Sequence, residues 1–181
     1  MNLRGLLIAL VALNVTVSGC GRKEDPRLAH WQQQLLTSTC PQNPLSIASV
    51  SNSAALADEV TLAGRIYGGK QSPFDPDSAS FTIIELPEPG HDHDDPGDCP
   101  FCKRKADNAA MAVVQVLDES GAPIAMPADK LLGLKQSQDV VVTGVPVRIG
   151  EILMLNASAV HVLDKEKALQ LAAQFAGEHA S

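Results

Sequence analysis

The stretch DVVVTGVPVRIGEILMLNASAVHVL, residues 139–163, decides the fold because it holds two strand patterns joined by a tight turn. In the first pattern, residues 139–149, Gly144 and Pro146 suggest a bulge or an edge. Gly150-Glu151 turns the chain, and the second pattern, residues 152–163, follows it. The apolar phase shifts between Leu155 and Val160, which predicts a β-bulge near residues 156–158. We therefore expect a long hairpin formed by strands 139–149 and 152–163.

Three shorter segments upstream of this hairpin also have strand character. The clearest is the first, in which Val60, Leu62 and Ile66 alternate with other residues. Between the third and fourth strands a short helix is expected at residues 129–134, and Asp164 is placed to cap a C-terminal helix. That helix is predicted to bury the stripe Leu169, Ala172, Ala173 and Ala176. The three upstream strands are expected at residues 59–66, 81–86 and 111–117.

Five short strands without βαβ alternation predict an all-β fold with minor α content, arranged as a small barrel. Val60-x-Leu62-x-Gly64-x-Ile66 resembles the first strand of the OB fold, and the hairpin described above resembles its last two strands. The resemblance covers residues 58–163. It implies a five-stranded OB-like barrel with a long loop between the second and third strands. A shared fold does not by itself decide function.

The composition excludes some classes of function. The chain has 181 residues and a formal charge of −7, so a general phosphate-binding surface is not expected. Aromatic residues make up only 3% of the chain, which leaves few side chains on which bases could stack. Nucleic acid is therefore not an expected partner. No apolar run reaches the length needed to cross a bilayer.

The N-terminus has the pattern of an export signal, with Arg4 followed by the apolar stretch 5–13. Val17-Ser18-Gly19-Cys20 resembles the lipobox of bacterial lipoproteins, which implies lipidation of Cys20 and cleavage before it. An ordinary signal peptide is the alternative interpretation. Gly21, in place of the aspartate that resembles a retention signal, favours the outer membrane. The resemblance predicts a periplasm-facing protein that is held in the bacterial envelope by its lipid.

The expected domain organisation follows from these patterns. Residues 27–36 favour a short helix, and Pro41 and Pro44 prevent regular structure directly after it. The small polar residues after Pro44 are typical of a spacer. We expect a signal peptide at 1–19, a tether at 20–57, an OB-like domain at 58–163, and a C-terminal helix and tail at 164–181.

The long polar loop predicted between residues 87 and 110 carries the candidate chemistry. Its spacing H-x-H-x5-C-x2-C places His91, His93, Cys99 and Cys102 within twelve residues. Two imidazoles and two thiolates suit tetrahedral Zn²⁺, and Cu⁺ also favours thiolate ligands. The neighbouring aspartates could orient the imidazoles, and the basic residues after Cys102 could stabilise thiolates. A solvated acidic loop with a Cys99–Cys102 disulfide is the alternative.

A second interpretation concerns redox chemistry. Asp98-Cys99-Pro100-Phe101-Cys102 resembles the active-site motif of glutaredoxins, which have the thioredoxin fold. The resemblance implies Cys99 as the nucleophile and Cys102 as the resolving thiol, with Val145-Pro146 in the place of a cis-proline loop. The sequence would then encode a periplasmic thiol-disulfide oxidoreductase. Because the strands follow one another without intervening helices, we place this interpretation after metal binding.

The remaining candidate residues carry weaker signals. His30 and His179 fall in the expected tether and tail, and His161 is expected to face solvent or the barrel rim. Cys40 is the odd thiol, either free or paired with Cys99 or Cys102. The chain has neither a nucleophile elbow nor a phosphate loop. We therefore expect a protein that binds a metal or an envelope protein, and we do not expect catalysis.

Overall fold

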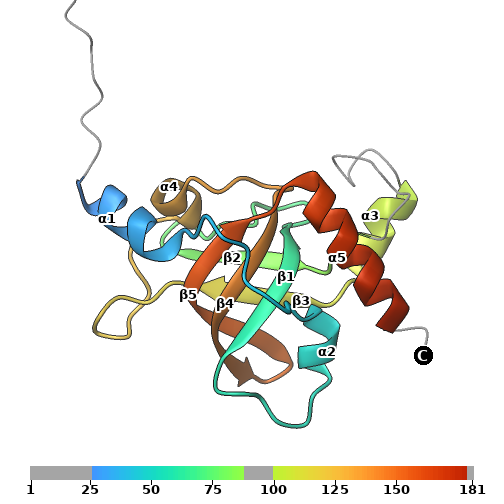
Figure 1. Cartoon of the computed structure of the whole chain (residues 1–181). Helices are drawn as coiled ribbons and strands as arrows, with labels where there is room; N and C mark the ends of the chain where they lie inside the picture. Colours follow the sequence, from blue (N-terminus) through green and yellow to red (C-terminus); the bar gives the residue numbers. More distant parts are fainter. Residues whose placement is uncertain (1–25, 88–99, 179–181) are drawn as a thin grey trace, which may run out of the picture.

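The computed structural model describes residues 26–87 and 100–178, and it contains five strands and five helices within them (Figure 1). The long polar segment of the sequence lies between the second and third strands. In chain order the elements are α1 (Pro26–Leu35), α2 (Ile47–Ser51), β1 (Val60–Ile66), β2 (Ser80–Ile84), α3 (Pro100–Asp107), β3 (Met111–Gln115), α4 (Ala128–Leu132), β4 (Asp139–Ile149), β5 (Ile152–Val162) and α5 (Lys165–Glu178).

The five strands form one mixed sheet in the order β1-β2-β3-β5-β4. Strand β4 also pairs with β1, through the register Val60↔Gly144 to Arg65↔Asp139, so each strand has two neighbours and the sheet closes into a ring. Only β3 and β5 are parallel. The five predicted strands, the short helix before the fourth strand and the C-terminal helix are all confirmed.

The β4–β5 hairpin agrees closely with the sequence prediction. Its two-residue turn contains Gly150 with φ +61°, a conformation that glycine adopts without steric cost. The register shifts where Thr143 pairs with Ala159 and Gly144 pairs with Ala157, which leaves Ser158 as the extra residue. The predicted bulge is therefore confirmed. It lets β5 keep apolar side chains inside the ring on both sides of the shift.

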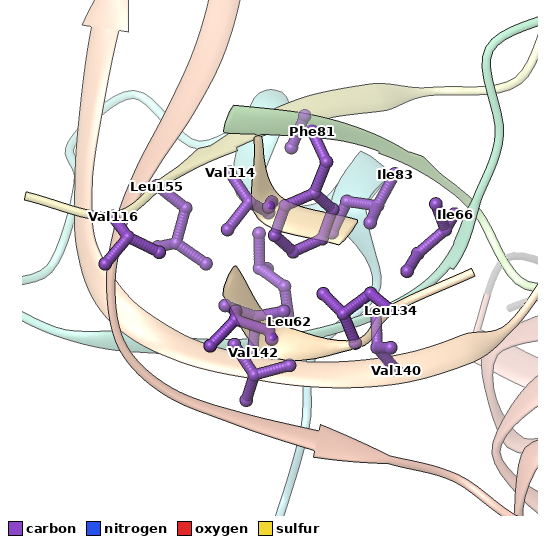
Figure 2. Close-up of a cluster of buried hydrophobic side chains, with 14 of the residues drawn as sticks. Leu62, Ile66, Phe81, Ile83, Val114, Val116, Leu134, Val140, Val142 and Leu155 are labelled. Atoms are coloured by element: carbon purple, nitrogen blue, oxygen red, sulfur yellow. The ribbon is translucent and has the colours of Figure 1, made fainter. Parts of the chain in front are cut away.

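The core fills the inside of the ring (Figure 2). Alternate residues of every strand point inward, as the period of two requires. Phe81 lies among the labelled side chains of Figure 2 with Val114 and Ile83 beside it, and it is 1% exposed. The labelled core residues are Leu62, Ile66, Phe81, Ile83, Val114, Val116, Leu134, Val140, Val142 and Leu155.

Part of the expected tether is packed against this sheet. The short helix expected at 27–36 is α1, and both α1 and α2 contribute buried residues to the core, among them Leu35 and Ile47. Between them Leu45 runs alongside β1: its N–H donates to the Thr61 carbonyl at 2.8 Å, and its carbonyl accepts from the Ala63 N–H at 3.1 Å. The structured domain therefore begins well before residue 58.

Helix α5 covers the outer surface of β1 and β4 through Ala63 and Val141. Asp164 caps it as predicted, accepting the Lys167 N–H at 2.7 Å. The predicted stripe is wrong except for Ala172, because Leu169 is 38% exposed and the two other alanines face solvent. The i, i+3, i+4, i+7 set that includes Phe175 buries more apolar surface. The buried stripe is Ala168, Leu171, Ala172 and Phe175.

Replacing Phe81 by alanine should lower the free energy of unfolding by about 3–5 kcal/mol, because it leaves a cavity inside the ring. Urea denaturation followed by circular dichroism measures this change. Leu169→Ala is the control, since that side chain is 38% exposed, and it should change the free energy by less than about 1 kcal/mol. Equal effects of the two substitutions would contradict the described core.

Candidate functional site

Most residues of the predicted metal site lie outside the described part of the chain. His91, His93 and Cys99 fall between residues 87 and 100, and Cys20 precedes residue 26. Cys102 belongs to α3, of which the structure describes the backbone at that position. What the structure describes is the frame of the segment: the two strands from which it leaves and returns, and the helix in which it ends.

The two ends of this segment are held together at the sheet. Strand β2 pairs with β3 in antiparallel register from Ser80↔Gln115 to Ile84↔Met111. One step further, the Glu85 N–H donates to the Ala110 carbonyl at 3.1 Å. The segment therefore leaves β2 and returns to β3 at neighbouring residues, and these two strands pair without it.

The end of the segment differs from the predicted loop, because residues 100–107 form helix α3. Pro100 is the first helical residue, a position where the missing N–H has no cost and the fixed φ favours a helix. Cys99 therefore immediately precedes the helix, and Cys102 lies in its first turn. The N-terminus of a helix stabilises thiolates, the form of cysteine that binds metals and attacks disulfides.

The other end of α3 is fixed to the outer surface of the sheet. Ala106 is buried against Tyr67 and Ile84. The Tyr67 hydroxyl donates to the Asp107 carboxylate at 3.3 Å. These two contacts with Tyr67 and Ile84 fix the direction of the helix that carries Cys102, and the Asn108 side-chain amide closes the end of the helix itself by donating to the Arg104 carbonyl at 2.7 Å. The anchor was not predicted from the sequence, although the alanines at 106, 109 and 110 after a charged run were a signal for a packed helix end.

His161, His30 and the odd cysteine have structural contacts, whereas His179 lies outside the described residues. His161 lies half-buried with Nδ1 2.7 Å from the Thr37 carbonyl, so its ring joins the N-terminal segment to β5. His30 is placed edge-on to Trp31, with ring centroids 5.7 Å apart. Cys40 is a free thiol that packs beside the cluster under α5. Across residues 26–87 and 100–178, no group of three or more His, Cys, Asp or Glu side chains could hold a metal ion.

Two features of the structure bear on the glutaredoxin resemblance. The described residues contain no cis peptide bond, so Val145-Pro146 is not the cis-proline that the resemblance implies. The chain also enters β2 directly from β1 and β5 directly from β4, without intervening helices. The placement of Cys99 immediately before a helix is the part of the resemblance that the backbone retains.

Comparisons with known proteins add no family: neither a family model nor a curated protein sequence matches the chain. A search of the described helices found none that is long and apolar enough to cross a membrane.

Ala106→Glu should detach α3 from the sheet, because it places a carboxylate in the apolar contact with Tyr67 and Ile84. Hydrogen exchange measures the effect: α3 amides should lose protection by about tenfold or more, while β4 amides keep theirs. Arg104→Glu introduces the same side chain at an exposed position of the same helix and is the matched control. Unchanged protection of α3 in Ala106→Glu would show that this contact does not hold the helix.

Proposed function

We propose that the protein is a lipid-anchored binding protein of the bacterial envelope, built on an OB-like barrel with a Zn²⁺ or Cu⁺ site in the segment between β2 and β3. The OB-like assignment is supported by the strand order, by the return pairing of β4 with β1, and by the position of α4 between β3 and β4. The single parallel pair, β3 with β5, follows from that order of five strands.

The observation that carries the metal site is the position of the two cysteines relative to α3. Cys99 precedes the helix and Cys102 lies one turn on, at the end of the helix that is remote from its anchor on Tyr67. A C-x2-C pair at a helix start offers two thiolates to one ion. His91 and His93 would complete four ligands, a set that fits tetrahedral Zn²⁺ and also contains the soft donors that Cu⁺ favours. In this proposal the ion closes the segment locally and catalyses no reaction.

The anchor is proposed from Cys20 and from the short distance to the folded domain. Helix α1 begins at Pro26, so five residues separate the proposed lipidated cysteine from the first described helix. The six steps from Cys20 to Pro26 span at most about 22 Å. The domain would therefore sit close to the membrane surface, facing the periplasm, within reach of an envelope protein partner. The outer membrane is the favoured location.

Thiol-disulfide exchange is the second candidate function, favoured by the same helix start. Cys99 would attack a substrate disulfide as the thiolate, forming a mixed disulfide and releasing one substrate thiol. Cys102 would then displace the second substrate thiol and leave a Cys99–Cys102 disulfide. The substrate is reduced and the enzyme is oxidised, so turnover requires an external dithiol reductant. The trans peptide at Val145-Pro146 and the consecutive strands place this candidate second.

Protein purified from the envelope fraction should contain about one zinc or copper ion per chain, with Cys99 and Cys102 reduced. Elemental analysis and a thiol count measure both quantities. The double substitution Cys99→Ser with Cys102→Ser should abolish metal binding, whereas Cys40→Ser should retain it, because Cys40 lies beside the α5 cluster. Metal-free protein with a Cys99–Cys102 disulfide would refute the metal site and favour the redox candidate.

The same double variant should remain folded, with a melting temperature lowered by only a few degrees. The ring closes through its own strand pairs, and an open loop of this length costs little conformational entropy. Removing the ion from the wild type with a chelator should give a similar decrease by mass action. Loss of the cooperative transition in the double variant would mean that the metal, and not the sheet, supplies the core stability.

Cys20→Ala should release the protein from membranes or stall its processing, because a lipid anchor contributes about 0.8 kcal/mol for each buried methylene. Fractionation of cells into membrane and soluble pools measures the release. Equal membrane association of the wild type and the variant would show that lipidation of this cysteine is not the anchor.

A further inference from the structure

We draw no further inference here: the strongest candidate, the exposed apolar patch that β3, β4 and β5 form around Ile149 and Ile152 on the outside of the sheet, carries no proposal because nothing in the structure shows what covers it.

Discussion

The pairing of β4 with both β1 and β5 is the constraint on which the rest of the structure depends. β4 is an eleven-residue strand: its first half joins β1 and its whole length joins β5. The ring could not close with a shorter strand, because one half alone would leave β1 or the hairpin tip without a partner. The bulge at Ser158 lets one strand serve both neighbours while the apolar side chains stay inside.

Closure also separates the candidate site from the stability of the core. The segment between β2 and β3 leaves and returns at paired residues, so the sheet is complete without it. Helix α3 is attached to the outside of this sheet through one apolar contact and one hydroxyl–carboxylate bond. A metal site or a redox pair at the helix start could therefore bind, release or oxidise without disturbing the ring. Functional residues often lie on loops that a rigid scaffold carries and that the scaffold does not need in order to fold.

The sequence predicted the hairpin well because two physical signals agreed there. Strand patterns were recognised on both sides of the turn at Gly150-Glu151, and the phase change in the second predicted a bulge at residues 156–158, where Ser158 is the extra residue. The packing of residues 26–57 could not be read in the same way, because Leu45 joins β1 by backbone bonds that leave no pattern in side chains. Helix α3 was missed because charged residues fill its middle. In α5 the alanines suggested one stripe, but the contact made by Phe175 decided which face is buried.

For the candidate site, the residue types and their spacing could be read from the sequence. The structure adds the position of Cys99 and Cys102 at the start of helix α3. The ligand set of two histidines and two cysteines remains a prediction, since it depends on side chains before residue 100 and at Cys102. His161 shows why a lone histidine is a weak signal. Its ring makes a bond to the Thr37 carbonyl, a long-range contact between residues 124 positions apart that no local pattern could reveal.

The N-terminal segment has a mechanical consequence. The Thr37 N–H donates to the Val160 carbonyl at 2.9 Å, and Leu45 is hydrogen-bonded to β1 through both its N–H and its carbonyl. A force applied to the chain ahead of α1 would reach the sheet first through these attachments, in the order in which they occur along the chain. The segment would detach from β5 before the force reaches the hydrogen bonds between Leu45 and β1. The five-stranded ring would stay closed. A domain tied to a moving surface in this way could lengthen its connection under tension and recover it without unfolding.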